Sequence, residues 1–353
     1  MERDWFYGVL MEAIHENPDI DVNEYEIDSL VSKVIENTLP EAADMLLNDL
    51  KIDSGEMLEE HRLIRQEFEA RLQRRWSKPI NLLEVLLVIG SESGESYYSD
   101  IYEELSDENR YLVYALVRIH ARACQIVYEI IRLLRSGFAD GAMARWRTLH
   151  ELSALAFFIK KHGNELAIMY LEYEHIEKYY EMIEYKQYAE RLGYFEFTEE
   201  QIQTVTIIKD DLKKKYGDDY IKNYGWTMKV LPKKARNFKG IEEDIGLDHL
   251  RPFYKLACNF IHLGPKAISS SLSLIEGSKV IVAGATNYGL ADPGQNAALS
   301  LTQITTCLLT TTHPSYDRLV LTKVMSTLTN EISQLFVDVQ KQLELEEQQE
   351  TQS

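Results

Sequence analysis

The chain has 353 residues, 45% of them hydrophobic and 27% charged, with a formal net charge of −19, which fits a globular protein large enough to bury a sizeable core. No apolar run approaches the roughly 18 residues of a membrane span, and the N-terminus lacks the basic start and small-residue cleavage site of a signal peptide. The three well-separated cysteines offer neither a disulfide framework nor a Cys-x-x-Cys metal site, so we expect a cytoplasmic protein without a membrane span.

The negative charge is concentrated at the two ends of the chain. Residues 1–60 hold 17 acidic and 3 basic side chains, and the tail from Glu344 adds four acids without a base. Residues 61–343 are nearly neutral, with 36 acidic against 35 basic side chains. An acidic section of this kind favours a basic protein partner. The composition predicts an acidic N-terminal helical section over 1–105, a helical core domain over 106–315, and a C-terminal helix with a frayed acidic tail over 316–353.

Hydrophobic residues recur at helical spacing along most of the chain, and no alternating pattern of useful length indicates a sheet. We therefore predict an all-α, multi-helix bundle. The first predicted elements are a helix over 1–15, acidic helices over 24–50 interrupted at Pro40, a helix over 57–76 ended by Pro79, a helix over 81–89 and a polar loop over 90–99.

Two long helices joined by a tight loop follow. The first covers 109–135 and carries Arg118 and Arg122 on a polar face, whereas His120 lies on its apolar side and is predicted to be a core histidine. The second covers 140–163 and is apolar on nearly every side, which indicates a buried central helix. Because the loop is short, the two helices should pack antiparallel.

Helical spacing continues to the end of the chain, with two irregular segments. The remaining predicted elements are helices over 165–192, 198–216, 250–263, 295–312 and 316–345, an irregular segment over 217–246, and a Gly-rich loop or short hairpin near 277–295 with a strand over 279–283. Thr198 followed by Gln201 is a capping-box signal for the helix that starts there.

Four polar residues of the central helix lie on or beside one line along its surface and are expected to sit in protein rather than in water: Asp140, Arg147, His150 and Glu151. Buried charges have to be paired. One interpretation is a structural network that fixes how neighbouring helices meet, with Arg147 and Glu151 as an i,i+4 pair. The other is an active or ligand-binding centre, because proteins tune pKa values at desolvated titratable groups. The sequence leaves both interpretations open.

A basic segment lies in residues 209–239, where ten Lys and Arg meet four Asp among aromatic side chains. Such a mixture can hold a phosphate backbone and stack bases, which makes RNA a candidate partner; the alternative is an ordinary solvated helix and loop. The acidic residues 1–60 could shield this segment or recruit a basic partner. The candidate nucleic-acid-binding residues are Arg118, Arg122, Lys213, Lys214, Lys215, Lys233, Lys234 and Arg236.

Three stretches carry a resemblance to a known family. They are FEARLQRRWSKPINLLEVLL, LLRSGFADGAMARWRTLHELSALAFFIKKHG with its RWRTLHE core, and YKLACNFIHLGPKA with the Gly-rich loop GATNYGLADPG. They resemble a family of bacterial proteins catalogued only as a domain of unknown function, over about residues 60–312. The resemblance implies a helical cytoplasmic protein and carries no established activity.

A second resemblance lies in the Arg-x4-His spacing of Arg145 and His150, which is similar to the signature of the helical ribonucleases called HEPN. The resemblance implies a homo-oligomer in which Arg and His meet at a dimer interface and cut RNA without a metal ion. An imidazole suits proton transfer near neutral pH, and a cation stabilises charge that develops on phosphorus. Along a regular helix the two residues point roughly 140° apart. Either a second subunit completes the site, or Arg147 is the partner of His150.

The leading hypothesis is a HEPN-like, metal-independent endoribonuclease of a bacterial defence or toxin-type system. The alternative is a non-catalytic helical interaction or scaffold protein with a structural buried polar cluster. The candidate catalytic residues are Arg145, Arg147, His150, Glu151 and His262, which the hypothesis brings together across two packed helices. Taken alone, His262 is predicted to be a core histidine. No nucleotide-binding, dinucleotide-binding, zinc-protease or hydrolase motif occurs, and we expect neither a cofactor nor a metal ion.

Overall fold

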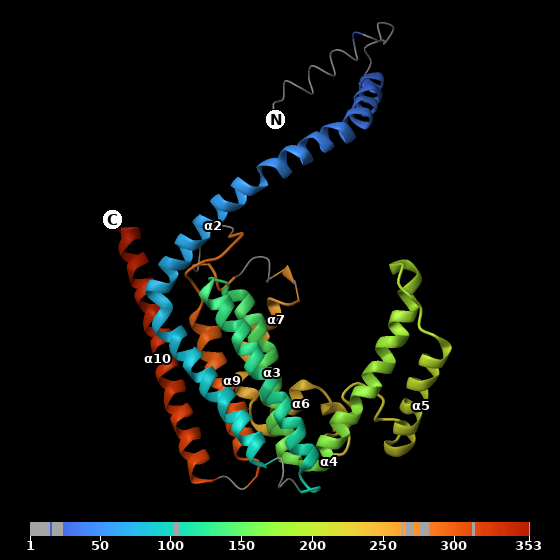
Figure 1. Cartoon of the computed structure of the whole chain (residues 1–353), viewed down its shortest axis with the longest axis vertical. Helices are drawn as coiled ribbons and strands as arrows, with labels where there is room; N and C mark the ends of the chain where they lie inside the picture. The colour runs from blue at the N-terminus through green and yellow to red at the C-terminus, as the bar shows by residue number, and fades with distance from the viewer. Residues whose placement is uncertain are drawn as a thin grey trace. The chain divides into compact units, whose positions relative to one another are not determined.

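The chain folds mainly into helices (Figure 1). The computed structural model describes residues 15, 24–101, 106–262, 264–265, 271–274, 282–312 and 315–352. The α-helices are α2 (Glu24–Ile101), α3 (Arg110–Arg135), α4 (Ala139–Leu192), α5 (Glu199–Tyr216), α6 (Phe238–Ile245), α7 (Arg251–Asn259), α9 (Ala291–Leu309) and α10 (Tyr316–Gln352). The 3₁₀ helices are η1 (Gly225–Thr227), η2 (Lys233–Ala235) and η3 (Asp248–Leu250). No strand occurs among the described residues, and the predicted all-α bundle is confirmed.

Contacts divide the chain into two compact units, Met1–Phe68 and Glu69–Ser353. In the described part of the first unit, the side chains of α2 lie mostly in water. Apolar side chains are among them, and Leu39, Met45 and Ile52 are 61–79% exposed. Most of the buried apolar side chains among the described residues therefore belong to the second unit.

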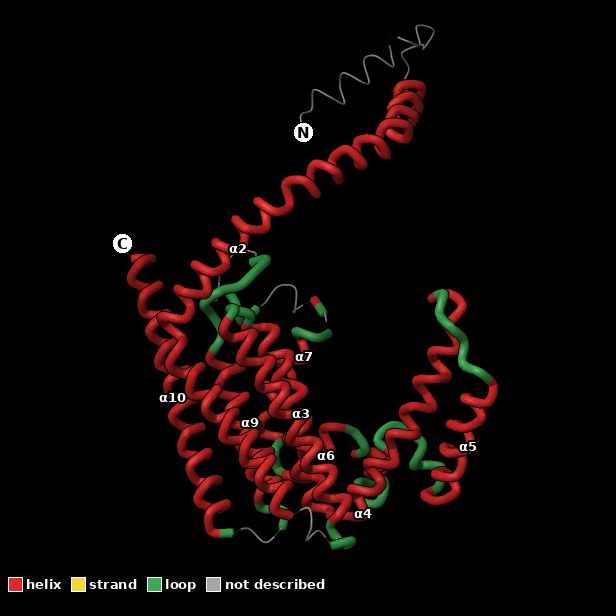
Figure 2. The backbone as a smooth tube through the Cα atoms, in the orientation of Figure 1, coloured by secondary structure: helices red, strands yellow, loops and turns green. Residues whose placement is uncertain are grey.

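The core of the second unit lies between α3, α4, α9, α10 and the part of α2 that belongs to this unit (Figure 2). The apolar stripe of α3 is fully buried at Val113, Ala123 and Val127. On α4, the indole of Trp146 is enclosed and donates a hydrogen bond to the Ser300 hydroxyl of α9 at 3.0 Å. Helix α9 is buried on nearly every side because α3, α4 and α10 all pack against it.

The two long central helices form the predicted antiparallel pair. Gly137 turns the chain between them with a φ of +79°, in the left-handed region that glycine adopts without strain. The backbone N–H of Leu112 donates to Oδ1 of Asn164 at 2.9 Å. The start of α3 therefore lies beside the middle of α4, as the short loop predicts.

Helix α4 is broken at Gly163, where φ is +80° and ψ is −165°. The break confirms the predicted end of the central helix at this residue. Beyond it, the second half of α4 leaves α3 and packs against α5 and η1 (Figure 1). The predicted capping box of Thr198 and Gln201 is present at the start of α5.

The N-terminal helix is longer than the sequence indicates. The predicted breaks at Pro40 and Pro79 are wrong, because both prolines lie inside the continuous helix α2. Near Pro79, packing of the fully buried Trp76 and Leu83 outweighs the loss of one backbone hydrogen bond. Pro40 lies in the exposed part of the helix.

The predicted polar loop over 90–99 is also wrong, since α2 continues to Ile101. Gly94 serves close packing, because a Cβ at this position would lie 2.4 Å from Cε1 of His120. His120 is itself buried, with Nε2 3.1 Å from the Thr305 hydroxyl, which confirms its prediction as a core histidine.

Two further predictions fall on or near residues that the structure leaves undescribed. The predicted strand over 279–283 lies mostly outside the described residues, and so does the helix over 1–15 apart from His15.

Helix α9 starts at Ala291, earlier than predicted, because Pro293 fits the first turn of a helix. In the described part of the chain, no helix combines the length and the apolar character needed to cross a membrane.

Candidate functional site

The polar residues of α4 face the segment that follows α5. At about 100° per residue, Asp140, Arg147 and Glu151 lie along one line of the helix, with His150 beside it. Helices α6 and α7 pack against α4. At the start of the line, Asp140 accepts a hydrogen bond from the backbone N–H of Leu272 at 2.8 Å. The polar side of α4 is therefore covered by chain segments that follow α5 in the sequence.

His150 is enclosed between three helices. Its Nε2 lies 2.9 Å from Oε1 of Glu242 on α6, and both side chains are 0% exposed. The other carboxylate oxygen of Glu242 accepts a hydrogen bond from Arg251 at the start of α7. The rings of Trp146 and Phe238 have centroids 5.3 and 5.8 Å from that of the imidazole. A buried carboxylate needs partners of this kind, so the network ties α4, α6 and α7 together.

Two residues of the polar line of α4, Arg147 and Glu151, form hydrogen bonds with Tyr254 of α7. Its hydroxyl donates to Oε1 of Glu151 at 2.7 Å and accepts from Nη2 of Arg147 at 2.9 Å. The same arginine nitrogen lies 2.9 Å from Oε1 of Glu151, which confirms the predicted i,i+4 pair. Its Nε donates to Sγ of Cys258 at 3.3 Å. We define the Tyr254 cluster as Arg147, His150, Glu151, Glu242, Arg251, Tyr254 and Cys258.

One edge of the Tyr254 cluster reaches solvent, since the side chains of Arg147 and Glu151 are 22% and 33% exposed.

Burial, followed by the hydrogen bond to Glu151, raises the pKa of Tyr254. Burial, followed by the charge of Glu151, also raises the pKa of Tyr224. Tyr224 has a φ of +56°, in the left-handed region that residues other than glycine rarely adopt. Both phenols therefore stay protonated near neutral pH and can act as donors.

Arg145 and His262 are not part of this cluster. Arg145 points to α3, where its Nε lies 2.5 Å from Oε2 of Glu129. It therefore has a different neighbour from His150, in keeping with the roughly 140° between the two positions on a helix. His262 is exposed, so the prediction of a core histidine is wrong here; α7 ends at Asn259, and the turn that follows lies at the surface.

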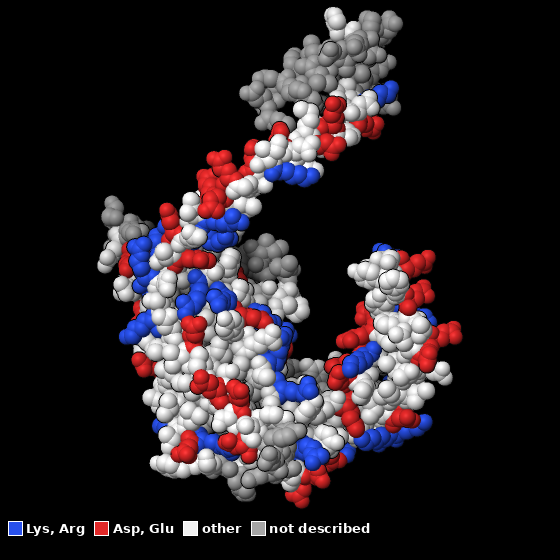
Figure 3. All heavy atoms as spheres, viewed as in Figure 1, with Lys and Arg blue, Asp and Glu red and all other residues white. Residues whose placement is uncertain are grey.

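The basic segment 209–239 is largely paired with acidic residues, and on the face of the molecule seen in Figure 3 basic and acidic side chains are interspersed. The pairs are Lys213 with Asp218 (3.0 Å), Lys214 with Asp211 (3.2 Å), Lys215 with Glu172 (2.7 Å) and Arg236 with Asp219 (2.9 Å). Lys233 and Lys234 are exposed in η2. The pairing leaves less uncompensated positive charge than the sequence indicates, and nucleic-acid binding by this segment stays a prediction.

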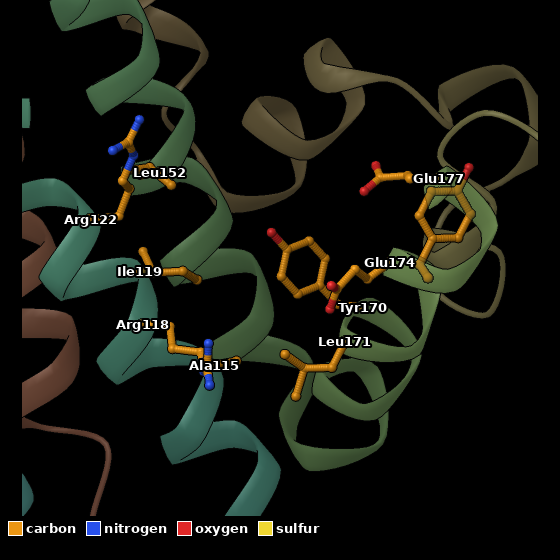
Figure 4. A pocket seen from close by; sticks show the side chains of 10 residues that line it. Ala115, Arg118, Ile119, Arg122, Leu152, Tyr170, Leu171, Glu174 and Glu177 are labelled. Atoms are coloured by element: carbon orange, nitrogen blue, oxygen red, sulfur yellow. The ribbon is translucent and has the colours of Figure 1, made fainter. Parts of the chain in front are cut away.

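Arg118 and Arg122 line a pocket of about 310 Å³ between α3 and the second half of α4 (Figure 4). Glu174 and Glu177 lie on the α4 side, across from the two arginines. The other lining residues are Ala115, Ile119, Leu152, Tyr170, Leu171 and Tyr173. The pocket is thus bounded by a basic wall and an acidic wall, with apolar and aromatic side chains between them.

Sequence reasoning missed the part of the Tyr254 cluster that α6 and α7 supply. The signal that could have found Glu242 is its place in the helix FKGIEEDI, where it lies on the same face as Phe238 and Ile245. The neighbouring Glu243 and Asp244 lie off that face. An acid within an apolar stripe has to find a buried partner, and His150 is that partner.

The described residues contain no group of three or more His, Cys, Asp or Glu side chains placed to hold a metal ion.

The Tyr254 cluster and both walls of the pocket belong to a part of the chain that resembles other proteins. No curated protein and no solved structure matches the chain. The predicted resemblance to a family of unknown function is confirmed for part of its range: residues 113–279, just under half of the chain, match the model of a family of unknown function (DUF5677).

Proposed function

We propose that this chain is a non-catalytic helical interaction protein in which the Tyr254 cluster is structural. The observation that carries the proposal is the enclosure of His150, whose imidazole is 0% exposed and whose Nε2 is engaged by Glu242. A general acid or base has to come within hydrogen-bond reach of its substrate. An imidazole sealed between three helices supports a role in joining those helices instead.

Arg145 and Arg147 of α4 support the same proposal, because each of these two already has a carboxylate partner. Arg147 lies against Glu151, and Arg145 lies against Glu129. A phosphate would have to displace these carboxylates before it could take up the guanidinium groups. The pairs therefore favour a structural role over phosphate binding at this point of the chain.

The proposed docking surface is the described part of α2 in the first unit. Apolar side chains such as Leu39, Met45 and Ile52 lie exposed on a helix from the acidic section of the chain. Exposed apolar side chains on a helix are a common way to bind a partner helix, and the acidic surroundings select a basic one. We infer a basic amphipathic helix of another protein as the partner.

The test compares His150→Ala with His249→Ala, an exposed histidine that serves as the matched control. We expect His150→Ala to lower the free energy of unfolding by about 3 kcal/mol, since it leaves a cavity and removes a partner of Glu242. His249→Ala should change it by less than about 0.5 kcal/mol. The purified wild-type protein should leave RNA intact. Cleavage of RNA that His150→Ala removes without loss of folding would overturn the structural role.

A second candidate is the HEPN-like ribonuclease of a bacterial defence or toxin-type system, acting as a homo-oligomer in the cytoplasm. The observation that favours it is the open edge formed by Arg147 and Glu151, with His262 exposed just beyond α7. In this proposal Arg147 stabilises the charge on phosphorus and His262 transfers the proton. Growth arrest on overexpression, lost in Arg147→Gln and His262→Ala but kept in His249→Ala, would support it. A wild-type protein that neither cleaves RNA nor arrests growth would exclude it.

A further inference from the structure

The pocket between α3 and the second half of α4 has two guanidinium groups on its basic wall. Arg118 and Arg122 lie one turn apart on α3, so they share a face of the helix. Arg118 stacks on Tyr114, with Cζ 4.2 Å from the ring centroid, and Arg122 donates to Oε1 of Gln125 at 2.6 Å. Neither forms an ion pair with a carboxylate in the part of the chain that the structure describes. Two forked guanidinium groups one turn apart suit a phosphate, whose oxygens can bond to both.

The acidic wall differs between its two carboxylates. Glu174 is paired with Lys178 at 2.5 Å. Glu177 has no basic partner within the described residues, although neighbouring atoms partly shield its carboxylate. This shielding, followed by the charge of Glu181, raises the pKa of Glu177. A donor N–H from a ligand would therefore be better accommodated here than at Glu174.

Between the two walls lie uncharged aromatic and apolar side chains. The ring of Tyr170 is held in an edge-on contact with Trp226, with ring centroids 5.0 Å apart. Burial raises the pKa of Tyr170 to about 12, so the phenol is uncharged at neutral pH. Leu152 and Ile119 complete the apolar lining (Figure 4). An aromatic base can stack on a surface of this kind.

We propose that this pocket binds a nucleotide. Its phosphate lies between Arg118 and Arg122, its base lies against Tyr170, and an exocyclic amine of the base donates to Glu177. A volume of about 310 Å³ is at the small end of ligand pockets and fits a single nucleotide better than a dinucleotide cofactor. A free mononucleotide and the end of an RNA strand present the same chemistry. The inference does not depend on the proposed function, because it rests on a different set of side chains.

Calorimetric titration of the full chain with AMP, GMP, CMP, UMP and inorganic phosphate tests the proposal. AMP, GMP and CMP carry an exocyclic amine and should bind, whereas UMP lacks it and should bind about tenfold more weakly. Arg118→Gln and Arg122→Gln should each weaken AMP binding by about tenfold to a hundredfold. Arg110→Gln is the matched control, because this arginine lies at the start of α3 and pairs with Asp107 outside the pocket. It should leave AMP binding unchanged.

Substitutions at the ring separate stacking from folding. Tyr170→Phe keeps the aromatic face and should bind AMP as the wild type does, whereas Tyr170→Leu should bind it about tenfold more weakly. A short single-stranded RNA can be titrated in the same way. Binding tighter than that of AMP, and abolished by the same arginine substitutions, would identify the end of an RNA strand as the ligand.

Four results would overturn the proposal: no saturable binding of any nucleotide, UMP that binds as tightly as AMP, arginine variants that bind AMP like the wild type, or inorganic phosphate that binds as tightly as AMP. The comparison of AMP with UMP uses the wild-type chain, so it decides the matter even if a variant fails to fold.

Discussion

Glu242 shows how one buried residue can hold several elements of this protein together. Its two carboxylate oxygens are used by different partners, His150 on α4 and Arg251 on α7. A carboxylate that is 0% exposed is stable only while such donors are present. The residue therefore contributes to the position of α7, and with it to the position of Tyr254.

Replacement of Glu242 by alanine should lower the free energy of unfolding by about 3 kcal/mol, because His150 and Arg251 lose their shared acceptor. Urea denaturation followed by circular dichroism measures the change. The neighbouring Glu243 provides the control, since it pairs with Lys239 at the exposed surface. Glu243→Ala should change stability by less than about 0.5 kcal/mol. Similar losses in the two variants would contradict the structural role of the buried network.

The core histidine predicts how stability depends on pH. Burial lowers the pKa of His120 to about 4, whereas a histidine in the unfolded chain titrates near pH 6.5. Below that pH the unfolded chain binds a proton that the folded chain does not. The stability contributed by neutral His120 is thus complete above about pH 6.5 and is lost as pH falls towards about 4, by up to about 3 kcal/mol. The free energy of unfolding, measured with urea across this pH range, should depend less steeply on pH in His120→Gln than in the wild type. An equal pH dependence in the two proteins would refute this.

At the level of whole elements, two glycines lie where a side chain of a neighbouring helix leaves no room for a Cβ atom. A Cβ on Gly94 of α2 would lie 2.4 Å from Cε1 of His120 on α3. On α9, a Cβ at Gly294 would lie 2.3 Å from Cζ of Phe336 on α10. These helices pack at their present distances only because the side chains are missing.

Gly94→Ala should destabilise the protein by about 1–3 kcal/mol, because overpacking outweighs the gain in helix propensity. Gly90→Ala is the matched substitution one turn earlier, where the new Cβ would meet Oγ1 of Thr305 at an ordinary 3.4 Å. It should be neutral or slightly stabilising. Thermal melting of both variants decides between them, and an equal loss would show that the helix crossing at Gly94 is looser than described.

The sequence predicts the elements of this fold better than their contacts. Helical periodicity correctly indicates α3, the break of α4 at Gly163 and the cap of α5, because these depend on nearby residues. Pro79 misleads, since tertiary packing decides whether a helix continues. For the site, the α4 residues are found from one helix alone, whereas Tyr254 is more than a hundred positions away and its contact follows from the folded chain. The HEPN-like activity and the domain limits drawn from composition stay predictions.

At the level of the whole molecule, the division at Phe68 separates an exposed helical segment from the folded core. Leu72 and Trp76 lie only a few residues further on and are already buried, at 1% and 0% exposure. Trp76 contacts Phe336 of α10, with ring centroids 5.9 Å apart. The start of the core is therefore sharply defined along the sequence.

A fragment covering 69–353 should melt within about 2 °C of the full chain, since it retains the core of the second unit. A fragment that starts at residue 82 loses Trp76 and should melt about 5–10 °C lower, because a large cavity opens beside Phe336. Calorimetry of both fragments measures this. A large drop already in the longer fragment would show that the first 68 residues stabilise the core.

The position of α9 has a consequence for the segment that the family model matches. Residues 113–279 end before α9 begins, yet Leu301 and Ile304 of that helix are almost fully enclosed by its neighbours, which include α3 and α4. Expressed alone, the segment would expose this apolar seam to water and tend to aggregate. Other proteins built around the same segment must therefore fill the seam with a helix of their own or with one borrowed from a partner.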